Sequence, residues 1–401
     1  MTELALHDPL LYDQGFPHER FAALRQHEPV SHHDHPASDR GYWVIARHGD
    51  VQQISRDAET WRNAPAPFVE IPAGSPPDPQ YDLLINLDGA DHTRMRKLVN
   101  RGFTPRRVGE LEAGLRTRVD SIIDALRDRA EADLVHDLAL WLPLHVIADM
   151  VGVPEQDRAQ VFAWTELTFG FDPATTDEQR SQAVLDIFSY AAALAEQRRE
   201  NPTDDLISLL LSADVDGHEL TQLQVSTFFL LLQNAGSETT RNLITSGLVA
   251  LLQHPDQMEA LRRDPQLIPT AIEELLRYVS PVMYFCRQAA RDTEVGGVPI
   301  PEGDRVMLSY VSANRDDWVF HQPDSLDVTR SPNPHVAFGA GGPHFCLGAN
   351  LARLEARVMF EALLSRFEGL ELASDPASSP RVRSNLIDGF AHQPIRWRSI
   401  T

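Results

Sequence analysis

The stretch from Phe338 to Gly348, FGAGGPHFCLG, restricts what this chain can fold into more than any other segment. It holds Cys346, one of only two cysteines in 401 residues, directly behind three glycines and a proline. The residues that follow, ANLARLEARVMFEALLSRF, repeat their apolar side chains at helical spacing. We therefore expect a glycine-rich loop that presents a thiol at a helix N-terminus, where the helix dipole favours a thiolate.

The loop by itself leaves two other interpretations open. A single cysteine is most often a small buried hydrophobic residue, and a glycine-rich loop before a helix can bind phosphate. The phosphate interpretation is the weaker one, because no Lys-Ser or Lys-Thr pair follows the glycines and no clear strand precedes them.

The composition excludes several classes of protein. With 58 acidic against 36 basic residues the net charge is −22, which argues against general nucleic-acid binding. Two cysteines without a CxxC motif form neither a disulfide framework nor a structural zinc site, and they fit a reducing, cytoplasmic location. The N-terminal residues have no basic region and no long apolar run, so we expect no signal peptide and no membrane anchor.

The longest helical pattern runs from Glu219 to Gln253, about 35 residues or roughly 50 Å. Its centre, NAGSETTRN, gathers small, acidic and β-branched residues that form helices poorly, and such a local conflict often marks function. The ordinary alternative is a Gly-Ser kink beside a solvated Glu238. Leu231, Ala235 and Thr239 follow one another at intervals of four, so they share one face of the helix.

Two charged pairs also have helical spacing. His92 and Arg96 are four residues apart on one predicted helix, and Glu274 and Arg277 are three apart on another. The ordinary explanations are a solvated basic helix and an exposed ion pair of little energetic value.

Two hairpins are expected in the C-terminal third of the chain. Residues 283–290 and a strand near 305–310 flank a Gly-Gly turn, and residues 381–397 alternate enough for a final hairpin with its tip at 385–390. Residues 108–212 are predicted to form successive amphipathic helices, so helices should dominate the fold.

Taken together and in this order, these motifs resemble the cytochrome P450 family. The His-x-x-x-Arg helix, AGSETT, the Glu-x-x-Arg pair, an arginine in the hairpin and the glycine-rich cysteine loop carry the resemblance, which extends from about residue 15 to 400. It implies a single domain over residues 1–401, mainly α with small β-sheets. Haem b would lie between a long distal helix and the cysteine loop, with Cys346 as the thiolate ligand of the iron.

The resemblance also implies roles for individual residues. Glu238 and Thr239 would deliver protons for O–O bond cleavage and are the expected catalytic residues. The other residues expected to contact haem are His92, Arg96, Arg287 and His344 at the propionates, and Ala235, Phe338 and Gly348 beside the macrocycle. The residues expected to line the substrate pocket are Leu231, Ala235, Val282, Tyr284 and Leu386.

The Glu274–Arg277 pair is expected to be buried and to brace the cysteine loop. Its third partner is less certain, because Ser325 stands where related sequences often carry arginine. Arg330 and His335 are both candidates for that third position, and we favour His335.

The cysteine loop also points to a subgroup. Phe338 lies eight residues before Cys346, one more than in the commoner form of the motif. This longer loop and the segment RVRSNLIDG are similar to those of bacterial relatives that oxidise steroid side chains and methyl-branched lipids. The similarity favours a terpenoid, steroid or fatty-acyl substrate, by analogy rather than by site chemistry.

The implied activity is that of a haem-thiolate monooxygenase that hydroxylates a hydrophobic small molecule with O₂ and two electrons. The sequence has no flavin or iron–sulfur motif, so separate ferredoxin and ferredoxin reductase chains would supply the electrons, and the enzyme is expected to be a monomer. The candidate docking residues are Arg94, Lys97, Arg101 and Arg353. Two alternatives remain: a P450-type enzyme with another outcome (peroxygenase, oxidative coupling, dehydration or isomerisation), and a haem-binding sensor.

Overall fold

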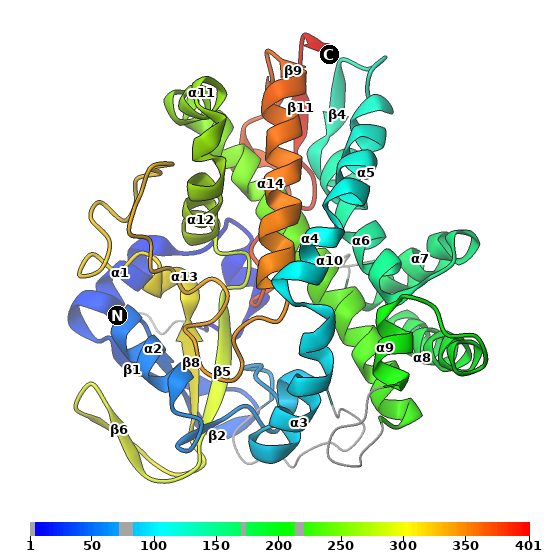
Figure 1. Ribbon diagram of the computed structural model, residues 1–401. Helices are drawn as coiled ribbons and strands as arrows, with labels where there is room; N and C mark the ends of the chain where they lie inside the picture. The colour runs from blue at the N-terminus through cyan, green and yellow to red at the C-terminus, as the bar shows by residue number, and fades with distance from the viewer. Residues whose placement is uncertain (1–4, 72–82, 170–173, 213–219) are drawn as a thin grey trace.

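The structure, a computed structural model, describes residues 5–71, 83–169, 174–212 and 220–401 (Figure 1). The α-helices are α1 His18–His27, α2 His48–Arg56, α3 Gly89–Val99, α4 Pro105–Glu110, α5 Glu112–Asp124, α6 Trp141–Val151, α7 Arg158–Phe169, α8 Asp177–Glu200, α9 Leu206–Leu211, α10 Gln222–Gln253, α11 Pro255–Arg263, α12 Ile268–Val279, α13 Tyr310–Ala313 and α14 Ala349–Arg366. The strands are β1 Val30–His35, β2 Ser38–Ile45, β3 Trp61–Arg62, β4 Glu131–Asp133, β5 Tyr284–Ala289, β6 Thr293–Val295, β7 Val298–Ile300, β8 Arg305–Ser309, β9 Phe367–Glu368, β10 Glu371–Leu372, β11 Pro394–Arg396 and β12 Ser399–Ile400.

The expected mainly helical fold with small sheets is confirmed. The main sheet has five strands in the order β1-β2-β8-β5-β3, and a second sheet joins β10, β11 and β4. β5 and β8 pair antiparallel as predicted. However, the Gly296-Gly297 turn closes the separate short ribbon β6–β7 between them, because both glycines adopt positive φ there.

The prediction of a final hairpin over residues 381–397 is largely wrong. Within the described residues, the segment from Arg381 to Phe390 makes one isolated bridge between its ends, and Ile387 bridges to Val282. The Ser384 hydroxyl accepts the backbone N–H of Leu386 and Ile387, both at 3.0 Å, which folds the tip into a tight turn instead of a ladder.

The long helix α10 runs through the middle of the molecule behind α14 (Figure 1). It begins after a capping box between Thr221 and Gln224 and ends before Pro255; residue 219 of the prediction lies outside the described residues. The helix continues unbroken through NAGSETTRN, and α6, α8, α12 and α14 pack around it. Packing on several sides therefore holds the poor helix formers in a helix.

One helical segment, Leu134–Val151, is long and apolar enough to cross a membrane, judged over the described residues. Inside this fold 67% of it is buried, and its α6 part packs against α10. Its apolar character is accounted for by the helical core.

Candidate active site

A cavity lies between α10 and the loop that precedes α14. From α10 it is lined by Leu231, Ala235 and Thr239, which the helical spacing placed on one face. From the opposite wall it is lined by Phe338, Cys346 and Gly348. Apolar side chains make up most of the remaining wall, among them Phe103, Phe228, Leu243, Val282 and Phe285.

The thiol of Cys346 opens onto this cavity at the start of α14. The backbone N–H of Cys346 donates to the carbonyl of Phe338 at 2.9 Å, which closes the loop around the sulfur. Burial raises the pKa of the Cys346 thiol, while the backbone N–H groups of Gly348 and Ala349 and nearby Arg96 favour the thiolate. The protein alone thus favours the neutral thiol, and a cation bound at the sulfur would be needed to stabilise the thiolate.

Glycines shape the loop because it runs against α2. Gly341 and Gly342 have φ of +96° and +79°, in the left-handed region. A Cβ on Gly342 would lie 2.0 Å from the carbonyl oxygen of Ser55, and one on Gly341 would meet Arg56 at 3.1 Å. Only residues without a side chain allow this approach.

Two histidines and an arginine gather at one edge of the cavity. The rings of His92 and His344 lie 4.2 Å apart, and His344 Nε2 is 3.5 Å from Asp88. Burial, with His344 and Arg96 nearby, lowers the pKa of His92 to about 4, so its imidazole is neutral at pH 7. Its Nε2 is buried and has no hydrogen-bond partner among the described residues, so it is free to donate to an acceptor in the cavity.

Two further predicted propionate contacts already have other partners. Arg96 lines the cavity, but its Nη2 donates to the carbonyl of Phe345 at 2.6 Å. Arg287 is buried, and its Nη1 donates to the carbonyl of Cys286 at 2.8 Å. Both roles stay predictions.

Glu238 and Thr239 are neighbours on α10, but their side chains have different surroundings. The Thr239 hydroxyl faces the cavity and donates to the carbonyl of Ala235 at 2.8 Å. Glu238 is buried and pairs with Arg241. Burial raises the pKa of the Glu238 carboxyl, and the Arg241 guanidinium opposes that change.

The Glu238 pair extends to the protein surface. Arg241 Nη1 lies 3.3 Å from both carboxylate oxygens of Glu166, and both residues line a second cleft on the far side of α10. Nothing in the sequence indicates Glu166 as a partner, although the spacing of three between Glu238 and Arg241 predicts an ion pair.

Two of the predicted substrate-pocket residues are wrong. Tyr284 does not line the cavity; its side chain packs in a separate core with Tyr12, and its hydroxyl accepts the Val69 N–H at 3.3 Å. Phe285 lines the cavity instead, because side chains alternate between the two faces of a strand. Leu386 also packs against the core around Tyr12, where the tight turn directs it.

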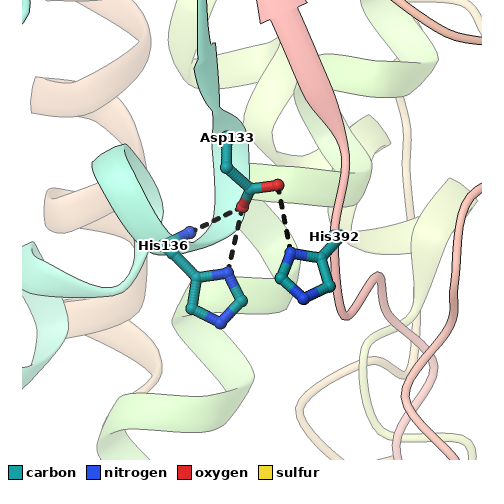
Figure 2. Close-up of side chains that lie close together, drawn as sticks. All are labelled: Asp133, His136 and His392. Carbon is teal, nitrogen blue, oxygen red and sulfur yellow. Dashed lines mark hydrogen bonds and ion pairs between the residues drawn. The ribbon is translucent and has the colours of Figure 1, made fainter.

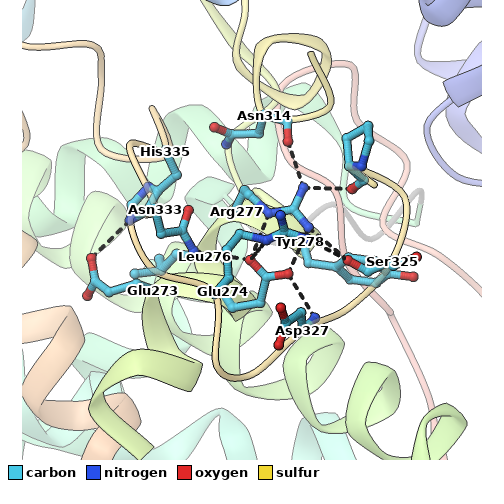
Figure 3. A network of polar contacts seen from close by, with 12 residues as sticks. Glu273, Glu274, Leu276, Arg277, Tyr278, Asn314, Ser325, Asp327, Asn333 and His335 are labelled. Atoms are coloured by element: carbon cyan, nitrogen blue, oxygen red, sulfur yellow. Dashed lines mark hydrogen bonds and ion pairs between the residues drawn. The ribbon is translucent and has the colours of Figure 1, made fainter. Parts of the chain in front are cut away.

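The predicted core pair is fully buried (Figure 3). Arg277 Nε and Nη2 each lie 2.8 Å from an oxygen of Glu274, and both side chains are 0% exposed. Arg330 Nε is the third partner, 3.0 Å from Glu274 Oε2, whereas His335 lies 3.0 Å from Glu273. The preference for His335 is therefore wrong, because its ring reaches the neighbouring carboxylate.

Comparison with known proteins identifies the family. A family profile described as Cytochrome P450 matches residues 144–387. A steroid C26-monooxygenase of Mycolicibacterium smegmatis is 38% identical over 402 residues, covering 97% of this chain and 92% of its own. The chain belongs to the cytochrome P450 family.

Other relatives agree with this assignment. A methyl-branched lipid omega-hydroxylase of Mycobacterium bovis is 41% identical over 391 residues, covering 94% of this chain and 90% of its own. The solved cytochrome P450 of the bacillaene polyketide synthase of Bacillus subtilis superposes with a TM-score of 0.90 at 34% identity, over 98% of this chain and 99% of that one. A solved Mycobacterium marinum cytochrome P450 in complex with pseudoionone superposes with a TM-score of 0.90 at 33% sequence identity, over 99% of each chain.

This P450 is thus an oxidoreductase, a monooxygenase of hydrophobic substrates that uses haem b. The residues of the cavity fit that group. A thiol faces small and apolar side chains across the cavity, and at its edge a buried His92 nitrogen has no partner among the described residues. A flat apolar macrocycle with polar carboxylates needs such a combination.

Proposed function

We propose that this P450 hydroxylates a steroid, terpenoid or fatty-acyl substrate on a hydrocarbon part of the molecule. The observation that carries the proposal is one mainly apolar cavity with Cys346 on one wall and Thr239 on the other. The steroid and methyl-branched lipid activities of the two relatives favour a bulky or branched aliphatic substrate. Leu231, Val282 and Phe285 are the cavity residues proposed to contact it.

Haem b, when bound, supplies the activation of O₂, and the protein supplies its ligand and contacts. Cys346 is the proposed iron ligand, with the N–H groups at the start of α14 sharing the charge of its thiolate. His92 and Arg96 are proposed to bind the propionates. The other proposed contacts are His344 and Arg287 at the propionates and Ala235, Phe338 and Gly348 beside the macrocycle.

Thr239 and Glu238 are proposed to manage protons on the distal side. The Thr239 hydroxyl donates to the Ala235 carbonyl and can accept a hydrogen bond from water in the cavity. Glu238 is the proposed proton relay: its pair with Arg241, which also contacts Glu166, places it beside the second cleft, and a movement of its carboxylate away from Arg241 would let it take a proton from cleft water and pass it toward Thr239.

Separate ferredoxin and ferredoxin reductase chains are the proposed electron donors to a monomeric, cytoplasmic enzyme whose residues 1–401 form one domain. Lys97 and Arg101 are the favoured residues for docking the ferredoxin, because both side chains are solvent-exposed near the edge of the cavity at which His92 lies. Arg94 and Arg353 are weaker candidates, because they pair with Asp91 and Glu273 at 2.9 Å and 2.6 Å.

Two measurements test the proposal. The reduced enzyme with carbon monoxide should give the red-shifted Soret band of a thiolate adduct, and a histidine-type spectrum would exclude Cys346 as ligand. A library of steroids, terpenoids and branched fatty acids should contain compounds that shift the ferric spin state and are hydroxylated with O₂ and a ferredoxin system. Turnover with peroxide alone, or binding without product, would favour the peroxygenase or sensor alternative.

A further inference from the structure

Two histidines and an aspartate, Asp133, His136 and His392, lie close together (Figure 2). Both histidines line the second cleft, and none of the three residues lines the cavity beside Cys346. Asp133 is the last residue of β4, and His136 lies in the π-helical turn Leu134–Ala139 that follows it. His392 comes from the other end of the chain, two residues before β11. The antiparallel pairing of β4 with β11 brings these distant segments together.

The donor atoms have spacings that suit a metal ion. One donor atom of each residue lies within 4.8 Å of the other two. Asp133 Oδ1 is 3.1 Å from His136 Nδ1, and Asp133 Oδ2 is 3.4 Å from His392 Nδ1. Ligands held at about 2.0–2.1 Å around a tetrahedral zinc ion lie roughly 3.3 Å apart. Two imidazole nitrogens and one carboxylate oxygen are a ligand set that Zn²⁺ and related transition metals accept.

The carboxylate of Asp133 is held in place by the backbone. Its Oδ1 accepts the N–H groups of Val135 and His136 at 3.0 Å and 2.9 Å, and its Oδ2 accepts that of Gln393 at 3.1 Å. Hydrogen bonds of this kind orient a metal-binding carboxylate. Oδ2 keeps a second lone pair, which now makes only the long contact to His392 and is available to a cation.

The site is accessible, and its surroundings do not repel a cation. The side chains of His136 and His392 are 48% and 59% exposed, at the rim of the second cleft. The arginines lining that cleft are each paired with carboxylates: Arg381 with Asp388, Arg383 with Asp13, and Arg241 with Glu166 and Glu238.

We propose that Asp133, His136 and His392 bind one divalent transition-metal ion of the zinc type, with water completing its coordination. The bound ion ties the segment before β11 to the turn after β4. The competing explanation is a metal-free hydrogen-bonded His–Asp–His cluster. It predicts the same contacts without an ion and therefore a different result in a binding experiment.

Equilibrium dialysis of the holoenzyme, freed of any histidine tag and of metal by chelator, tests the proposal. Against micromolar Zn²⁺, we expect one zinc per chain beyond the haem iron in elemental analysis, and a raised Tm. His136→Ala and His392→Ala should each weaken zinc binding at least tenfold and abolish the Tm shift. Asp133→Asn, which keeps an oxygen for the backbone N–H groups, should also weaken it.

His27→Ala is the matched control, because His27 is an exposed histidine at the end of α1 outside this cluster. It should retain zinc binding, and all variants should keep the haem-to-protein ratio. The proposal is overturned if the wild-type chain binds no zinc at tens of micromolar, or if the His136 and His392 variants bind it as tightly as the wild type.

Discussion

Glu238 and Arg241, one turn apart on α10, form an ion pair whose side chains are only 6% and 7% exposed. The pair lies between two cavities, since Thr239 borders the haem cavity and Arg241 borders the cleft on the other side. A buried carboxylate stays ionised only when a partner compensates its lost hydration. Arg241 thus offsets part of the hydration that Glu238 loses on burial, as the proposed proton-transfer role of Glu238 requires.

Replacing Glu238 by Gln should lower kcat by about 10², within the range that a positioned acid–base group contributes. The amide fits the same space but cannot relay a proton, so the solvent deuterium isotope effect on turnover should increase. Glu166→Gln is the matched control, because Glu166 also pairs with Arg241 but is partly exposed to solvent. It should lower kcat less than Glu238→Gln does. An unchanged kcat in Glu238→Gln would remove this residue from the proton route.

Thr239→Ala should uncouple the reaction. Loss of the hydroxyl removes the group proposed to hold water beside the reacting oxygen, so NADH consumption should continue while product falls and hydrogen peroxide is released. Thr227→Ala is the control, because its hydroxyl makes the same kind of bond to a carbonyl one turn back, at 3.0 Å from Leu223, outside the cavity. Full coupling in Thr239→Ala would contradict the proposed role.

The residues that the sequence predicted best are those fixed by short, local spacing. Leu231, Ala235 and Thr239 line the cavity because their intervals on one helix dictate a common face. The spacing of three likewise lets Glu274 and Arg277 pair on one helix, whereas their burial was expected only from the resemblance to the family.

The predictions that are wrong concern residues whose position depends on contacts between distant segments, or on which of two neighbouring residues in a strand faces the cavity. Tyr284 and Phe285 exchange roles because a shift of one residue reverses the face of a strand. Whether Arg330 or His335 reaches Glu274 depends on the conformation of the loop that carries both residues, and this conformation is set by the contacts of their side chains. The direction of Leu386 likewise depends on the turn that the Ser384 side chain forms. The His136 and His392 cluster needs two strands that pair across most of the chain.

Gly342→Ala should impair the cysteine loop. The substitution adds a Cβ 2.0 Å from the Ser55 carbonyl and forces a non-glycine residue to φ +79°, which by itself costs about 1–2 kcal/mol. We expect a lower Tm and less bound haem per chain. Gly49→Ala in α2 is the control, since its Cβ would meet nothing within 4 Å, and equal haem content in the two variants would contradict the argument.

The pairing of Glu273 should make stability depend on acidity. Burial alone would raise the pKa of this carboxyl, but hydrogen bonds from Arg353 and His335 lower it to about 2. Because the folded pKa lies below the unfolded value, its stabilisation is full above about pH 4.5 and is lost as the pH falls toward 2. Glu273→Gln should therefore lower Tm at pH 7, and its difference from wild type should shrink as the pH falls from about 4.5 to about 3; a constant difference over that range would contradict the pairing.

The partner of Glu274 can be measured by double-mutant cycles in urea unfolding, followed by tryptophan fluorescence. Combining Glu274→Gln with Arg330→Ala should give a coupling energy of about 1–3 kcal/mol, because a charged hydrogen bond joins these side chains at 3.0 Å. The same cycle with His335→Ala should give a coupling near zero, since His335 bonds Glu273 instead. His335→Ala should still lower the free energy of unfolding, because it removes a buried ring. This cost is the same with and without the Glu274→Gln substitution, so it cancels in the coupling energy. A larger coupling to His335 than to Arg330 would restore the sequence-based preference.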